Sequence, residues 1–528
     1  MPKKIDRIAN SFFRIPIFLL ERLSPHFFMV QEQQPLTKGI AKRGNRSWQG
    51  IAFLSALTIA IFAIIMTAPL DLTQGNEDRM AGHVYDAVHN GNWICPVDPV
   101  GNLPTKPPLF AWLSSLATLV TGSITPFTLY FPAVLSTLLL ACVVYLTGSK
   151  FFSKRAGIIA GLAILFAPGM IKQMDACRHD GVFALGISLA AIAAFHSWMS
   201  GRNWIWFWLA VIIATLTKGP LGVVLAAGGL IAVYWEKKSG NSIPLRGKQW
   251  PGIIVFLLIT GGWFALACWQ TNGAIIQKMI YKELFGHAIT GKDGDVTRLS
   301  FYKPALTFLG NFAPWSLLAG IGLWRIWKKP SSDATERRFE RFLFCWFVLG
   351  LTLFSLAAHH RSRLIIPLYP VGALLAGREL ARLLSNMNHR RFLQTCTALT
   401  VAGLIAVAFD QHIIERKSPG VVNTEGMRQL AQHVRDNHYL PLTTIDAPFA
   451  FQFYLNDVRP LTPLNLGVEF LQKETPVFVA VTSLEKLRRL SGLKNFHELA
   501  RWPETGEALL SIVSNHPKAG TVALERRK

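Results

Sequence analysis

The chain has little charge for its length. Only 16% of its 528 residues are charged and 51% are hydrophobic, whereas a soluble domain carries roughly a quarter charged residues. The deficit is spread over many long apolar runs. This composition excludes a large soluble core and predicts a polytopic membrane protein.

Signatures of metal and nucleotide binding are also missing. The six cysteines show no CxxC or other metal-binding spacing. Cys95 and Cys177 fall in predicted outer loops, and a disulfide between them is an open alternative that no spacing supports. The tail after Asp410 has no phosphate-loop glycine pattern and no catalytic motif.

Acidic residues are scarce relative to basic ones. The 54 lysines and arginines against 31 acids give a net charge of +23. The basic residues sit in short clusters between apolar runs, which is typical of positive-inside topology signals and not of a nucleic-acid-binding surface.

The apolar runs predict an all-α polytopic membrane protein with about eleven transmembrane helices. Residues 1–50 are basic and read as a cytoplasmic or interfacial segment, and residues 51–409 form the transmembrane module. The predicted spans are Ile51–Leu70, Pro126–Leu146, Ala156–Ile171, Gly181–Met199, Trp204–Thr217, Leu221–Trp235, Gly252–Trp269, Pro304–Trp327, Phe342–Ala358, Leu364–Gly377 and Phe392–Phe409. With the N-terminus inside, the loops richest in lysine and arginine become cytoplasmic.

Two further regions lie outside the membrane in this topology. The long first outer loop, residues 71–125, is expected to hold two surface helices joined by a connector, Trp93–Pro107. Pro108–Val120 is too short to span, so it should lie along the membrane face. Residues 410–528 predict a small extracytoplasmic α/β domain, with strands at Leu442–Ile445, Phe451–Tyr454 and Pro476–Thr482 and helices at Thr424–Asn437 and Ser483–Ser491.

The external face collects charged residues from distant parts of the sequence. Acids there can serve as a general base or bind a divalent cation, and lysine and arginine suit a phosphate. Beside a deep apolar scaffold, this combination predicts a lipid-phosphate substrate. The charged residues are Glu77, Asp78, Arg79, Lys106, Asp175, Arg178, Asp180, Lys218, Lys282, Glu283, His287, Arg298, His359, His360, Arg361 and Arg363. The alternative for each is an ordinary solvated loop end.

Over Ile51–Gly377 the chain resembles the polyprenyl-phosphate-sugar glycosyltransferases of the GT-C fold, including the bacterial lipid A aminoarabinose transferases and the protein O-mannosyltransferases. The pieces that carry the resemblance occur in family order: NEDRMA, GNWICP, TKPPLFAWL, CRHDGVFAL, LTKGPLG, YKELFGHAITG, NFAPWSLL and SLAAHHRSRLIIPLYPVGALLAG. The resemblance implies an inverting displacement, in which an acceptor hydroxyl attacks the anomeric carbon and polyprenyl phosphate leaves.

The resemblance also implies catalytic roles for three acids. The family motif opens with Asp-Glu and an arginine two positions on; here Asn76 replaces the aspartate and Arg79 is in place. Because Asn76 cannot act as a base, that role falls to Glu77 or Asp78. Asp180 matches an acid that the family uses for metal binding or loop organisation, and Mg²⁺ or Mn²⁺ is therefore a tentative cofactor. Helix capping is the structural alternative for Glu77 and Asp180.

A second implied group would bind the donor phosphate. It comprises Arg79, Lys106, Arg178, Lys218, Arg361 and Arg363. For Lys106 the alternative is a lysine that reaches toward the membrane interface, and for Lys218 a helix-end cation. For the arginines near 361 it is a topological boundary. Trp93 and Trp112 could stack on sugars or belong to an interfacial aromatic belt.

The sequence therefore predicts a bacterial inner-membrane glycosyltransferase with its active site on the periplasmic face. Its donor would be a polyprenyl-phosphate sugar and its acceptor lipid A or another envelope glycolipid, with protein hydroxyls as the next acceptor. A transporter or binding protein for a lipid-linked sugar is the rival from another class; inverted repeats and mid-membrane charges, expected of a transporter, are not evident. No nucleic-acid partner is expected.

Overall fold

The structure is a computed structural model of the chain. It describes residues 40–515, apart from residues 74–75, 100, 241–242, 282–300, 358–361, 438, 440–441, 446, 457–468, 470, 473–474, 476, 483, 485–495 and 504–506. The expected interfacial helix near the N-terminus and the helix at Ser483–Ser491 therefore lie largely outside the described residues.

Long apolar helices make up most of the described chain. Seven stretches are long and apolar enough to cross a membrane: Ser47–Thr67 within α2 (Ile40–Thr67), α5 (Pro126–Phe151), α8 (Asp180–Ser200), Trp250–Gln270, α17 (Ala334–Leu356), Ser362–Leu383 and His389–Lys417. The pair α6 (Lys154–Leu165) and α7 (Pro168–Met174) is bent by 58° and would make an eighth. The chain is thus a helical membrane protein, as its composition predicts.

Besides Ala156–Ile171, which falls on the bent pair α6 and α7, three of the eleven predicted spans do not form single long helices in the described chain. The first is α9 (Ile205–Lys218), which has only 14 residues. The second, Leu221–Trp235, is divided into α10 (Leu221–Ala227), a 3-10 turn and α11 (Ala232–Lys238). The third is interrupted between α15 (Lys303–Asn311) and α16 (Trp315–Lys328), where Pro314 precedes the second helix. Hydropathy measures apolar length but not helix continuity, so the count of eleven is not confirmed.

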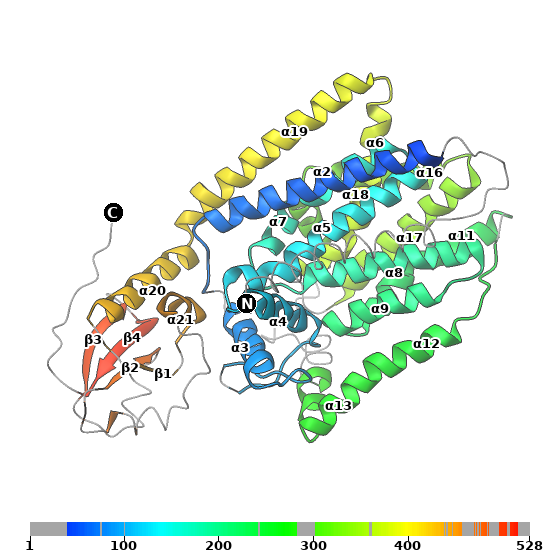
Figure 1. The fold of residues 1–528 in the computed structure, drawn as a ribbon. Helices are drawn as coiled ribbons and strands as arrows, with labels where there is room; N and C mark the ends of the chain where they lie inside the picture. Colours follow the sequence, from blue (N-terminus) through cyan, green and yellow to red (C-terminus); the bar gives the residue numbers. More distant parts are fainter. Residues whose placement is uncertain are drawn as a thin grey trace.

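The centre of the bundle packs tightly because small residues let helices approach closely. A Cβ on Gly377, in α18 (Tyr369–Leu383), would lie 2.4 Å from the Ala156 carbonyl oxygen of α6. Inside a membrane there is no hydrophobic driving force between helices, so their association depends on close packing of this kind. At the periphery, α2 runs beside α19 (His389–Phe409), and α12 (Trp250–Phe256) with α13 (Gly262–Gln270) forms an arm along another edge (Figure 1).

The first outer loop forms the two helices that the sequence predicts. They are α3 (Asn76–His89) and α4 (Leu109–Thr121), and they pack on each other. Asp86, which is 7% exposed, holds the connector between them. Its carboxylate accepts hydrogen bonds from the Asn90 and Asn92 side chains and from the Val97 N–H, at 2.7–2.8 Å. One buried carboxylate therefore fixes the path of the connector.

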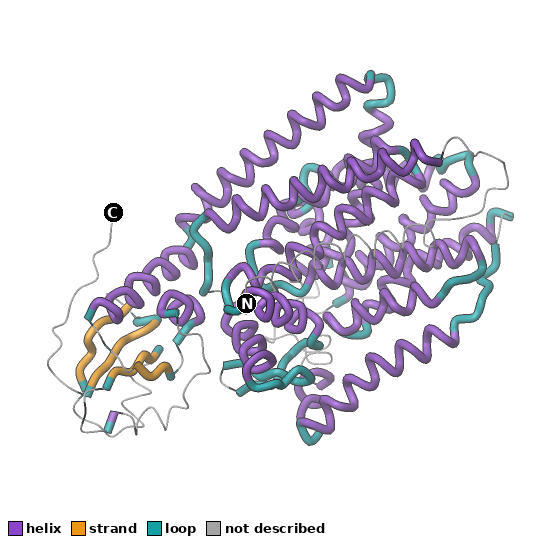
Figure 2. The backbone as a smooth tube through the Cα atoms, in the orientation of Figure 1, coloured by secondary structure: helices purple, strands orange, loops and turns teal. Residues whose placement is uncertain are grey.

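The tail forms an α/β domain at one end of the molecule, where the only strands of the described chain lie (Figure 2). Its sheet has the order β1-β2-β4-β3, with β1 (Leu442–Thr444) parallel to β2 (Phe478–Val481). The other strands, β4 (Leu510–Ser514) and β3 (His497–Trp502), pair antiparallel. The predicted strand at Phe451–Tyr454 is wrong. It lies in α21 (Phe449–Leu455), because a short apolar run fits a buried helix as well as a strand.

This α/β domain, called the outer domain because the predicted topology places it outside the membrane, shares a hydrophobic core with the first outer loop. Met80 and Val84 of α3 belong to the same buried cluster as Met427 and Leu430 of α20 (Pro419–Asp436). The Leu72 N–H also donates to Oγ1 of Thr424, at 2.9 Å. This docking places the domain directly against the helix that carries Glu77 and Asp78.

Candidate functional site

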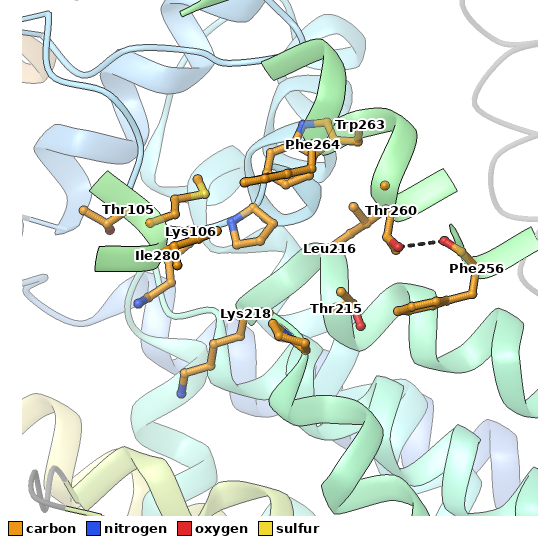
Figure 3. A pocket seen from close by; sticks show the side chains of 15 residues that line it. Thr105, Lys106, Thr215, Leu216, Lys218, Phe256, Thr260, Trp263, Phe264 and Ile280 are labelled. Carbon is orange, nitrogen blue, oxygen red and sulfur yellow. Dashed lines mark hydrogen bonds between the residues drawn. The ribbon is translucent and has the colours of Figure 1, made fainter. Parts of the chain in front are cut away.

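A cavity of about 340 Å³ opens beside the connector, α9 and the arm formed by α12 and α13. One part of its wall is basic, with Lys106 and Lys218. Most of the remaining wall is apolar, and its residues include Leu216, Phe256, Trp263, Phe264, Met279 and Ile280. In Figure 3 the amino groups of the two lysines extend to the same side of the cavity. The cavity therefore joins a cationic end to an apolar groove.

Local backbone geometry positions both lysines. Lys106 precedes Pro107 and Pro108, which restrict the backbone of the connector just before α4 begins. Lys218 is the last residue of α9 and is followed by Gly219, whose φ of +110° favours glycine. Its Nζ lies 5.4 Å from the centre of the Phe183 ring. Lys218 thus stands at a helix end, and it also lines the cavity.

Asp180 lies next to this basic end. It is 4% exposed, stands in the first turn of α8, and forms an ion pair with Lys218. Arg363, half-buried in the 3-10 segment Ser362–Leu368, is close enough to interact electrostatically with the Asp180 carboxylate. His179, not Asp180, occupies the N-cap position, so Asp180 is not the helix cap. No group of three or more His, Cys, Asp or Glu side chains that could hold a metal ion occurs among the described residues.

His179 is a residue of this site that the sequence analysis did not single out. Its ring centre lies 4.7 Å from that of Phe110. Burial lowers the pKa of His179 to about 3, although the Asp180 carboxylate opposes the shift. Lys106, Lys218 and His83 also act on it electrostatically. A neutral imidazole thus lies near the positively charged side chains of Lys106 and Lys218. In the sequence, the only indication that His179 belongs to the site is its position directly before Asp180 in CRHDGVFAL.

Glu77 occupies a separate, fully buried place on the core side of α3. The Cys177 N–H donates to its Oε1 at 3.2 Å, and its Oε2 has no hydrogen-bond partner. Burial raises the pKa of Glu77 to about 7, against the opposing effect of the Cys177 hydrogen bond. The buried hydroxyl of Tyr130, which also lacks a partner, interacts electrostatically with this carboxylate. Glu77 does not line the cavity that holds Lys106 and Lys218.

The other two charges of the NEDR motif face different surroundings. The Phe449 N–H at the start of α21 donates to the Asp78 carboxylate, so Asp78 contacts the outer domain. Burial raises the pKa of Asp78. Arg79 is exposed, on the side of α3 that also carries His83. Adjacent residues of one helix turn thus point in different directions, and the motif does not converge on one point.

The remaining predicted residues are divided between described and undescribed segments. Arg178 lies in the loop before α8, and its charge acts against the effect of burial, which raises the pKa of Asp175 to about 6. Arg361 lies outside the described residues, as do Lys282, Glu283, His287, Arg298, His359 and His360.

Two aromatic and two cysteine predictions have simple structural outcomes. The Trp112 Nε1–H donates to the Trp93 carbonyl oxygen at 2.5 Å, so this hydrogen bond links α4 to the connector. Cys95 and Cys177 are both free and belong to separate hydrophobic clusters, and Cys95 packs near Cys268. The Cys95–Cys177 disulfide is absent from this structure.

Comparison with known proteins identifies the class to which this arrangement is similar. Residues 105–264, which include Lys106, Asp180 and Lys218, match the family model of dolichyl-phosphate-mannose-protein mannosyltransferases. The fold matches that of ArnT from Cupriavidus metallidurans, with a TM-score of 0.65 for the apo structure and 0.63 for the structure bound to undecaprenyl phosphate. Both matches show 17% identity, and they cover 90% and 89% of this chain and 99% and 98% of the other. The resemblance to GT-C polyprenyl-phosphate-sugar glycosyltransferases is thereby confirmed.

Among individual proteins, a named relative is the undecaprenyl phosphate-alpha-4-amino-4-deoxy-L-arabinose arabinosyl transferase 2 of Proteus mirabilis. It is 26% identical over 340 residues, which are 61% of this chain and 59% of the relative. An uncharacterized protein of Aquifex aeolicus is 25% identical over 62% of this chain and 64% of its own length. The matched segment thus spans less than two thirds of either relative.

Proposed function

We propose that the chain is a membrane glycosyltransferase that moves a sugar from a polyprenyl phosphate, such as undecaprenyl phosphate, to an acceptor outside the cytoplasm. The observation that carries the proposal is the cavity with two lysines at one end and an apolar groove at the other. Lysines suit a phosphate as point charges, and an apolar wall suits a polyprenyl chain. The fold shared with ArnT supports the same class.

The residues of the basic end have complementary roles in this proposal. Lys106 and Lys218 bind the donor phosphate and stabilise the negative charge that it gains as the glycosidic bond breaks. Asp180 positions Lys218 through their ion pair, and Arg363 adds positive charge nearby. Arg79, Arg178 and Arg361 are further proposed phosphate contacts, and Asp180 is also the proposed ligand of a divalent cation, Mg²⁺ or Mn²⁺.

The base in the proposed displacement is Glu77, with Asp78 as the alternative. A carboxyl with a pKa of about 7 is half ionised at neutral pH and can accept a proton from an acceptor hydroxyl. Glu77 is fully buried in this structure, so this role requires that the acceptor reach it through a rearrangement of the first outer loop.

Glu77→Gln and Asp180→Asn are both expected to abolish transfer, and full activity in both variants would refute the site assignment.

Lipid A or another envelope glycolipid is the acceptor that the sequence resemblance implies, whereas the names of the relatives support the undecaprenyl-phosphate sugar donor. The test is a mass spectrum of lipid A from cells with and without the gene. A sugar-sized mass that appears only with the gene supports this acceptor. Identical spectra would contradict the lipid A proposal and favour protein hydroxyls, because the description of the matched family model names a protein as the acceptor.

A further inference from the structure

The connector and the arm formed by α12 and α13 each contribute one cysteine to the place where they pack together. Cys95 lies in the connector and Cys268 in α13, and both thiols are free in this structure. Cys95 is 1% exposed and forms a small buried cluster with Ala267 and Ile275. Cys268 packs against the same cluster. Two cysteines that are distant in the sequence are therefore brought together at one interface.

Hydrogen bonds hold these two segments together close to the cysteines. The Trp263 Nε1–H donates to the carbonyl oxygen of Ile94 at 3.0 Å. The Gln270 side chain donates to Oδ1 of Asn92 at 2.8 Å. Asn92 is in turn fixed to Cys95, because its side chain donates to the Cys95 carbonyl oxygen at 2.9 Å and its Oδ1 accepts the Cys95 N–H at 3.3 Å. The approach of α13 to the connector is thus fixed within a few residues of each cysteine.

The two thiols differ in their accessibility. Cys268 is partly exposed, and it is close enough to Cys95 for the two side chains to interact electrostatically. Burial is the main cause that raises the pKa of Cys95 to about 11, so this thiol is protonated at neutral pH. The thiolate is the nucleophile in disulfide exchange. An external reagent therefore reaches Cys268 first, and Cys95 is placed to react second.

We propose that Cys95 and Cys268 form a disulfide, because the predicted topology places both at the outer face of the membrane, where oxidising conditions allow such bonds. The Cys268 thiolate attacks an external disulfide such as oxidised glutathione, and a mixed disulfide forms as one glutathione thiol leaves. The Cys95 sulfur then attacks the Cys268 sulfur, and the second glutathione thiol leaves. The protein thereby loses two electrons and two protons, and the glutathione disulfide is reduced to two thiols.

The bond joins two segments that form opposite parts of the cavity wall. The connector supplies Thr105 and Lys106 to this wall, and the arm supplies Trp263 and Phe264 (Figure 3). In the reduced protein only packing and hydrogen bonds hold these segments together, whereas the disulfide links them covalently. Formation of the disulfide does not depend on the reaction proposed for the cavity, so either claim can fail without the other.

The test counts free thiols in the full-length protein in detergent, after incubation with a mixture of oxidised and reduced glutathione. The protein is then denatured and labelled with a maleimide, and its mass is measured. Oxidation should remove two of the six free thiols of the wild type, and a reductant should restore all six. Peptide mapping without reductant should find one cross-linked pair, Cys95 with Cys268.

Two alanine variants separate this pair from other thiol chemistry. C268A should lose no free thiol on oxidation. The matched control C396A removes a cysteine that belongs to the core of the bundle, and it should lose two free thiols like the wild type. An oxidised wild type with all six thiols labelled would overturn the proposal. So would a glutathione adduct on Cys268 without a cross-link, a Cys95–Cys177 pair, or a disulfide between two copies of the chain.

Discussion

At the residue scale, the buried carboxylates of Asp180 and Glu77 differ in whether a cation lies against them. Asp180 is buried with a cation, Lys218, directly against it. Glu77 is buried with no cation directly against it and with its Oε2 lacking a hydrogen-bond partner, so its ionised form is poorly stabilised. These carboxylates should therefore respond differently to pH and to mutation.

The Glu77 carboxyl should make stability depend on pH. Its pKa rises from 4.5 to about 7 on folding, so the folded state holds a proton that the unfolded chain has lost in that interval. The free energy of unfolding should fall as pH rises through this window, by up to about 3 kcal/mol. Glu77→Gln should remove most of this slope. Melting curves in detergent between pH 4.5 and 8 measure it, and parallel curves for variant and wild type would contradict the assignment.

The Asp180–Lys218 pair should show strong coupling. Lys218→Met leaves a buried carboxylate unpaired and should cost about 3–5 kcal/mol of stability. Adding Asp180→Asn removes the stranded charge, so the double variant should recover most of that loss and yet remain inactive. A double-mutant cycle of melting measurements tests this. Additive losses would mean that the ion pair contributes little.

The structure brings the predicted cationic residues together, but it does not bring the predicted acids together. Lys106 and Lys218 were both expected to bind phosphate, and they line one cavity, because proline and glycine fix the backbone beside them. Glu77 and Asp78 are neighbours in sequence but contact different partners, Cys177 and Phe449. No local pattern reveals partners that lie 100 and 371 residues away.

At the scale of elements, α3 connects the membrane bundle to the outer domain. Its core face packs with α20, and Asp78 receives the first N–H of α21. The outer domain thus contacts the helix that carries the proposed base. Hydropathy could not predict that α15 and α16 are separate helices, because both halves of the run are apolar.

Thr424 provides a test of this docking. Thr424→Val removes the acceptor of the buried Leu72 N–H and should destabilise the docked domain by about 1–3 kcal/mol. Thr424→Ser keeps the hydroxyl and serves as the matched control. Limited proteolysis of the region after Lys417 should be faster in the valine variant than in the serine variant. Equal rates would show that this hydrogen bond does not hold the domain.

At the scale of the whole molecule, the arrangement joins three parts around one cavity. The connector supplies Lys106, the bundle supplies Lys218, which pairs with Asp180, and the α12–α13 arm supplies most of the apolar wall. The arm packs on the connector through the Trp263 Nε1–H, which donates to the Ile94 carbonyl oxygen at 3.0 Å. The central claim is that this cavity binds the phosphate and the chain of a polyprenyl donor together.

The most direct test is sugar transfer from a labelled undecaprenyl-phosphate sugar to lipid A in proteoliposomes, compared between Lys106→Met and Lys172→Met. Lys172 is exposed in α7, which the predicted topology places on the same side of the membrane, and it does not line the cavity. Loss of a group that stabilises developing charge should lower the rate about a hundredfold in the Lys106 variant, whereas the Lys172 variant should match the wild type. Equal rates in both variants, with the wild type active, would contradict the central claim.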